Sequence, residues 1–223
     1  MKQNALFRNI LGWVVTVLTP FVILMFSIRI LITPLFPRVE YRMPGFPEDP
    51  FGFTLEDRLT WSAPSIEYLV NNESIGYLAD LTFEDGSPIY NANELSHMED
   101  VKSVVTGMRV ALTVSMLVLL AIVIIGVRQG WRGDLLYAFR RAGWGVIGLI
   151  VTILMFVAVA FDQLFTWFHQ LFFQQGNWQF YTSDTLIRLF PIRFWQDAFI
   201  YVGVLSFGIG ILLIIFGRTR KTG

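Results

Sequence analysis

The sequence predicts an all-α membrane protein with four transmembrane helices, and three observations support this fold class. The 223 residues are 54% hydrophobic and only 15% charged, whereas soluble domains carry about 25% charged residues. Four uncharged runs of 18 to 20 residues occur along the chain, and a helix needs about 20 apolar residues to cross a bilayer. Acidic and basic residues gather in different connecting segments.

The first uncharged run covers residues 9–28 and predicts a first span over about 9–33. The run is longer than the apolar core of a secretory signal, and no small-residue cleavage site follows it. We therefore expect an uncleaved anchor. The other runs predict spans over about 108–128, 142–163 and 197–217.

The charges predict the orientation of these spans. The N-terminus, the loop over about 129–141 together with Arg128 just before it, and the C-terminal tail hold nine basic residues and one acid, Asp134. Segment 36–103 holds 13 acids and four basic residues. Because basic loops stay in the cytoplasm, both termini and the 129–141 loop are predicted to be cytoplasmic. Segments of about 36–104 and 164–196 are then extracytoplasmic, and the whole chain forms a single integral membrane domain.

The first outer segment has turn-forming prolines at its start and then signs of local order. Thr54 can cap a helix that begins at the next residues, and Asn91 or Asn93 can cap one that starts near Glu94 and continues into the second span. Its apolar residues are too few for a large core of its own. We expect this lobe to pack on the membrane or on the other outer segment.

The second outer segment, 164–196, is strongly aromatic. An aromatic belt at the membrane interface explains part of this density. The glutamines and Asn177 mixed among the aromatic residues are more typical of an amphipathic interfacial element.

The chain has two histidines, His97 and His169, and each lies beside an apolar run at its predicted outer end. Histidine is the side chain whose unperturbed pKa lies near neutral pH. A pair at one membrane face suggests proton transfer or a metal site, although an interfacial histidine is often only a surface residue. The short cytoplasmic loop makes the second and third spans antiparallel neighbours, which brings both histidines to one side.

Several chemistries are excluded or disfavoured. Cysteine is absent, and there is no P-loop, dinucleotide-binding fingerprint or G-x-S-x-G elbow. Two alternatives stay open. The histidines can act as a general acid–base pair, or they can bind zinc together with Glu94 or Asp100, although H-E-x-x-H is absent.

A family resemblance gives these residues a substrate. The stretch His97-Met98-Glu99-Asp100-Val101-Lys102 and the pattern F-H-Q-L-F-F…W-Q-F…L-F-P…F-W, from Phe168 to Trp195, resemble the bacterial family of the lipoprotein intramolecular transacylase (Lit). The resemblance covers essentially the whole chain. Its two motifs fall on the two histidines.

The resemblance implies an enzyme of the bacterial cytoplasmic membrane with its active site at the extracytoplasmic face. Such enzymes move the sn-2 acyl chain of a diacylglyceryl-cysteine lipoprotein to the α-amine of the same cysteine, giving a lyso-form lipoprotein. The family's two histidines correspond to His97 and His169, which we expect to be the catalytic general acid and base. The partners implied are the diacylated lipoprotein N-terminus and membrane lipid, with no cofactor, metal or nucleic acid.

Supporting roles follow from the chemistry of ester aminolysis. Glu94 or Asp100 can orient an imidazole, as carboxylates do in histidine-based sites. Asn177, Trp178 and Arg193 are candidate donors to the oxyanion of the tetrahedral intermediate. A noncatalytic scaffold or receptor with an acidic outer lobe is the main alternative, and a metal-dependent membrane hydrolase is a lesser one.

Overall fold

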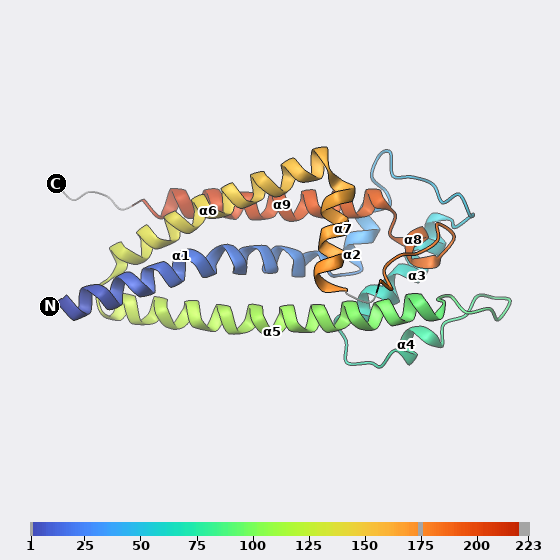
Figure 1. Cartoon of the computed structure of the whole chain (residues 1–223), viewed down its shortest axis with the longest axis horizontal. Helices are drawn as coiled ribbons and strands as arrows, with labels where there is room; N and C mark the ends of the chain where they lie inside the picture. The colour runs from blue at the N-terminus through green and yellow to red at the C-terminus, as the bar shows by residue number, and fades with distance from the viewer. Residues whose placement is uncertain (1, 174–175, 219–223) are drawn as a thin grey trace. The chain divides into compact units, whose positions relative to one another are not determined.

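The computed structural model describes residues 2–173 and 176–218, and these residues form nine helices and no strand (Figure 1). Gln174, Gln175, Arg220 and Lys221 lie outside the described residues. Four helices are long and apolar enough to cross a membrane. They are α1 (Lys2–Leu31), α5 (Ala92–Arg128), α6 (Arg132–Val159) and α9 (Ile192–Phe216). The predicted all-α fold with four transmembrane helices is confirmed.

The chain divides into two compact units, and the long helices contribute to both. Unit 1 comprises residues 1–29, 109–155 and 200–223, and unit 2 comprises residues 30–108 and 156–199. Unit 1 therefore contains most of the apolar length of the four long helices. Unit 2 contains the two segments predicted to lie outside the membrane.

Close helix contacts at small residues hold unit 1 together. A Cβ atom added to Gly143 of α6 would lie 2.7 Å from the carbonyl oxygen of Gly210 in α9. The hydroxyl groups of Ser27 in α1 and Ser206 in α9 are both fully buried and lie 3.0 Å apart. Such contacts replace the hydrophobic effect, which does little between helices inside a bilayer.

Five shorter helices lie in unit 2: α2 (Leu35–Glu40), α3 (Leu55–Tyr68), α4 (Gly76–Ala79), α7 (Phe161–Phe172) and α8 (Thr185–Leu189). The predicted cap at Thr54 starts α3. Its hydroxyl accepts a hydrogen bond from the Asp57 amide, and the Asp57 carboxylate accepts one from the Thr54 amide. This reciprocal pair is a capping box.

The two outer segments share one hydrophobic core in unit 2. Tyr68, Leu78 and Ile89 from the first segment pack with Leu186 and Leu189 from the second. Hydrogen bonds connect the segments as well, because the Thr185 hydroxyl donates to the Ile89 carbonyl at 2.6 Å. The expectation that the first lobe packs on the other outer segment is confirmed.

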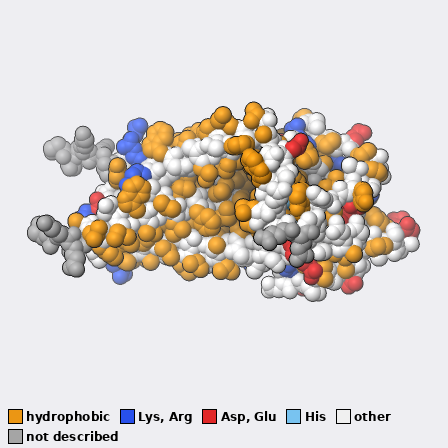
Figure 2. Space-filling model, in the orientation of Figure 1, with side chains coloured by type: hydrophobic (Ala, Val, Ile, Leu, Met, Phe, Trp, Pro, Cys, Tyr) orange, Lys and Arg blue, Asp and Glu red, His pale blue; other side chains and the backbone are white. Residues whose placement is uncertain are grey.

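The surfaces of the units differ in character. Figure 2 shows hydrophobic side chains covering much of the visible surface of the long helices, whereas Asp and Glu gather over elements of unit 2. Exposed hydrophobic residues recur along the apolar part of α5, including Val114, Leu117 and Leu120. In a membrane such a surface meets lipid tails.

Candidate active site

α5 carries His97 in its second turn, well before the apolar run that begins at residue 110. The helix starts at Ala92 because Asn91 caps it: its Oδ1 accepts hydrogen bonds from the amides of Asn93 and Glu94. Asp100 lies one turn after His97 and shares its helical face. The single long helix therefore presents His97 and Asp100 together.

α7 carries His169 in its last turn. The helix follows a break at Ala160, where the backbone leaves the helical region after α6 ends at Val159. His169 Nδ1 lies 2.8 Å from the carbonyl oxygen of Phe165, four residues earlier. Because a carbonyl oxygen only accepts, Nδ1 carries a proton, and in the neutral ring Nε2 has the free lone pair.

The structure brings the two imidazoles together. Their ring centroids lie 6.1 Å apart with an angle of 18° between the planes, and each side chain is only 8% exposed. Aromatic rings surround the pair. Phe173 contacts both histidines, Phe180 packs edge-on against His97, and Trp178 packs against His169 at 5.0 Å. The histidines thus lie in an aromatic, largely water-excluded site within unit 2.

Asn177 and Asp100 form the polar side of this site. The Asn177 Nδ2 group donates to Asp100 at 2.7 Å and to the hydroxyl of Ser96 at 3.4 Å. Two buried atoms, Nδ1 of His97 and Oδ1 of Asn177, have no hydrogen-bond partner of normal geometry among the described residues. Buried polar atoms without partners are rare away from functional sites.

Burial controls the protonation of both rings. It lowers the pKa of His97 to about 4, assisted by the charge of a protonated His169 and opposed by Asp100 and Asn177. Burial also lowers the pKa of His169, and the hydrogen bond to Phe165 opposes this shift. Both imidazoles are therefore neutral at pH 7, and either can accept a proton.

Glu94 lies near His97 in the sequence but makes its contacts elsewhere. Its Oε2 accepts the Asn91 amide at 2.8 Å, and its Oε1 accepts the Leu186 amide at 2.7 Å. The side chain is 1% exposed, and this burial raises its pKa. Glu94 thus joins the start of α5 to α8. Asp100 is the carboxylate that faces His97.

Arg193 belongs to a group of charges at the start of α9. It forms an ion pair with Asp197, one turn further on. Asp197 lies beside Glu40, which is fully buried and whose carboxylate oxygens have no hydrogen-bond partner of normal geometry among the described residues. Burial first, and then the neighbouring Asp197 carboxyl group, raise the pKa of Glu40 to about 7.

The zinc alternative finds no support in the arrangement of potential ligands. Within residues 2–173 and 176–218, no group of three or more His, Cys, Asp or Glu side chains is placed to hold a metal ion. A catalytic zinc site needs three protein ligands.

Comparison with known proteins identifies the family. The sequence model of "Lipoprotein intramolecular transacylase Lit" matches residues 13–195. The chain belongs to this family. As a Lit family member it is, at family level, an acyltransferase with a lipoprotein as its partner, and its four apolar helices make it a multi-pass membrane protein.

Two further comparisons found similar proteins. A protein of Aquifex aeolicus, named only "Uncharacterized protein", is 29% identical over 219 residues, which is 96% of each chain. The structure of Lit from Bacillus cereus matches with a TM-score of 0.75 and 16% identity, covering 94% of this chain and 93% of that one. A histidine-to-arginine variant of that protein matches with a TM-score of 0.74 and 17% identity, covering 97% and 95%. At these identities the two structures show the fold.

Some residues around the histidines of this Lit family member were missed by the sequence analysis. Phe173 and Phe180 enclose His97, and the Phe165 carbonyl fixes the proton of His169. The four-residue spacing of Phe165 and His169 in a helix was a usable signal for the last contact. Nothing in the sequence indicates which of its 21 phenylalanines face the site.

Proposed function

We propose that the chain moves the sn-2 acyl chain of a diacylglyceryl-cysteine lipoprotein to the α-amine of the same cysteine, with His97 and His169 as the proton-transfer pair. The observation that carries this proposal is the buried, aromatic-enclosed pair of neutral imidazoles in a member of a lipoprotein transacylase family. The charge distribution along the sequence supports a site at the outer face of a bacterial cytoplasmic membrane, with both termini in the cytoplasm.

His169 is proposed as the general base. Its Nδ1 proton is committed to the Phe165 carbonyl, so Nε2 is the atom that accepts a proton. The substrate α-ammonium has a pKa near 8 and must lose a proton before its nitrogen can attack. The freed amine then adds to the ester carbonyl, forming the new C–N bond.

His97 is proposed to donate a proton to the leaving oxygen. Collapse of the tetrahedral intermediate breaks the bond from the acyl carbon to the sn-2 oxygen, and that oxygen needs a proton. His97 takes a proton from the attacking nitrogen and passes it on, because its lowered pKa makes the imidazolium a ready donor. Overall, ammonium and ester give amide, alcohol and one proton released to water.

Positioning and oxyanion stabilisation complete the mechanism. The amine and ester belong to one molecule, so holding them in contact can supply several kcal/mol through effective molarity. Trp178 packs on His169 with ring centroids 5.0 Å apart, which makes its indole N–H the preferred oxyanion donor. Asn177 already donates to Asp100, and Arg193 is paired with Asp197.

The test is product analysis in a bacterium that lacks this activity. Mass spectrometry of a lipoprotein N-terminus should detect an N-acylated lyso form when the wild-type chain is expressed. His97→Ala and His169→Ala should each lower the rate by about 10²–10⁴-fold. Gln170→Ala, beside His169 on an exposed face, is the matched control and should keep the activity.

Three results would contradict parts of this proposal. An unmodified lipoprotein with wild-type protein present and folded rejects the transacylase and favours a scaffold or receptor. Full activity in both histidine variants rejects the acid–base pair. Loss of activity with a chelator, restored by zinc, favours a metal hydrolase.

A further inference from the structure

Arg141 occupies an unusual environment in unit 1, at the start of the third uncharged run. Its guanidinium lies over the ring of Trp13 at 4.2 Å and over Tyr137 at 5.0 Å. It also packs on Gly12, where an added Cβ would lie 3.7 Å from Nη2. Its Nε is buried and has no hydrogen-bond partner among the described residues. The cation is held by aromatic rings, and no carboxylate among the described residues pairs with it.

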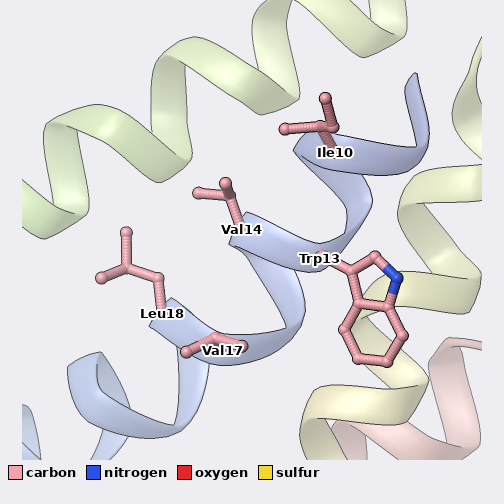
Figure 3. A pocket seen from close by; sticks show the side chains of 5 residues that line it. All are labelled: Ile10, Trp13, Val14, Val17 and Leu18. Atoms are coloured by element: carbon pink, nitrogen blue, oxygen red, sulfur yellow. The ribbon is translucent and has the colours of Figure 1, made fainter. Parts of the chain in front are cut away.

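A groove on α1 adjoins this cation through Trp13. It has a volume of about 470 Å³ and is lined by Ile10, Trp13, Val14, Val17 and Leu18 (Figure 3). These residues recur at three- and four-residue spacing, so they follow one side of the helix over about 12 Å of its axis. The lining is almost wholly apolar. One end therefore carries a cation beside an aromatic ring, and the rest suits a hydrocarbon chain.

The charges at this end of the helices decide what can cover the cation. Seven described basic residues flank the uncharged runs here against one acid, Asp134, and Asp134 is already paired with Arg8. A second copy of unit 1 would therefore bring more positive charge and no unpaired Asp or Glu side chain. A phosphodiester with attached acyl chains supplies both the anion for Arg141 and the chain for the groove.

We propose that unit 1 binds one anionic glycerophospholipid, with its phosphate on Arg141 and one acyl chain along the α1 groove at Trp13. The site is separate from the histidine pair and does not depend on the catalytic proposal. The ligand is a phospholipid of the surrounding membrane, held by a charge-assisted hydrogen bond and by apolar contact. Arg141 supplies the preference for an anionic lipid, and Trp13 belongs to both parts of the site.

Native mass spectrometry of the purified full-length protein tests the site. Phosphatidylglycerol and phosphatidylcholine with identical chains are titrated against wild type, Arg141→Gln and Arg140→Gln. Arg140→Gln removes the same charge at the neighbouring residue and is the matched control. Wild type and Arg140→Gln should bind the first phosphatidylglycerol molecule more tightly than phosphatidylcholine. Arg141→Gln should weaken the binding of that phosphatidylglycerol molecule by about tenfold, as expected for the loss of one charged hydrogen bond.

A fluorescence measurement tests whether the lipid acyl chain lies along the α1 groove at Trp13. Phosphatidylglycerol brominated on its acyl chains should quench tryptophan emission of the wild type more than that of Trp13→Phe. Glycerophosphate, which lacks chains, should not compete at the same concentration. Equal binding of both lipids by wild type would overturn the proposal, and so would equal losses in the two arginine variants. Effective competition by glycerophosphate would leave a simple anion site and reject the lipid.

Discussion

Units 1 and 2 belong to the same chain but are stabilised by different interactions. Unit 1 contains one of the 17 acidic residues, Asp134, and unit 2 contains the other 16. In unit 1, helices approach at glycine and serine, as Gly143 and Gly210 illustrate. In unit 2, buried polar groups make specific hydrogen bonds, as Glu94 does with two backbone amides.

The difference teaches how each environment limits the chain. Inside a bilayer, burying apolar surface gains little, so close van der Waals contact and a few hydroxyl pairs determine the packing. Outside it, a hydrophobic core forms, and buried charge is tolerated where backbone amides satisfy it. Both histidines lie in unit 2, buried among aromatic rings.

The largest effect on stability is expected from removing the buried side chain of Glu94 in unit 2. Glu94→Ala leaves the amides of Asn91 and Leu186 without their acceptor, at a cost of about 4 kcal/mol for two buried donors. Glu94→Gln keeps one carbonyl oxygen and should lose about half as much. Thermal unfolding in detergent measures both. Equal, small losses would mean that these hydrogen bonds contribute little to unit 2.

Acid should act on unit 2 through two groups with opposite signs. The pKa of His97 is lowered to about 4, so stability is present above pH 6.5 and is lost as pH falls towards 4, by about 3 kcal/mol in total. The pKa of Glu40 is raised to about 7, so its contribution is present below pH 4.5 and is lost as pH rises through 7.

Two variants separate these contributions. Relative to wild type, His97→Gln should become more stable as pH falls from 6.5 towards 4, because the variant has no buried imidazole whose protonation destabilises the folded state. Glu40→Gln should gain relative stability as pH rises from 4.5 to 7. Thermal unfolding across pH 4–8 gives the differences. If the stability of both variants relative to wild type changed in the same direction with pH, the assignment of the two pKa shifts would be contradicted.

A smaller effect is expected from the close helix contact of unit 1. Gly143→Ala forces a methyl group to within 2.7 Å of the Gly210 carbonyl oxygen, and overpacking of this kind costs about 2 kcal/mol. Gly148→Ala in the same helix meets nothing within 4 Å and should be neutral. Unfolding of both variants in lipid nanodiscs measures the cost. A neutral Gly143→Ala would show that the helices can separate freely.

The smallest effect should come from the helix cap in unit 2. Thr54→Ala removes the hydroxyl that accepts the Asp57 amide, which should cost about 1 kcal/mol. Thr60→Ala, at an exposed position inside α3, removes a threonine hydroxyl that does not cap the helix. This control should change the stability little or raise it slightly. A similar loss in both variants would argue against a special role for the cap.

The sequence predicted the features that depend on local pattern. Four uncharged runs were enough for the spanning helices, and Thr54 and Asn91 were recognisable as caps. The topology predicted that both imidazoles lie on one side, but it did not predict that their rings lie 6.1 Å apart. Contacts such as Asn177 with Asp100, 77 positions apart, arise only when both outer segments fold together.

Other residues had no sequence signal of their role. Glu40 is one of 13 acids in its segment, and nothing in the sequence marks it as fully buried against Asp197. Arg141 is one of several arginines in the 129–141 loop, and only its contacts with Trp13 and Tyr137 distinguish it. Burial is a property of the folded chain, so composition does not reveal it.

The length of α5 has a consequence for the substrate. His97 precedes the apolar run at residue 110 by 13 residues, which corresponds to about 20 Å along the helix axis. Under the proposed function, an acyl chain raised by that distance to reach His97 would expose methylene groups to water at about 0.8 kcal/mol each. The exposed Trp167, Leu171 and Phe172 of α7 offer an apolar surface for such a chain. Reaction rate should then depend on how well α7 shelters a lifted chain, as well as on the chemistry at the imidazoles.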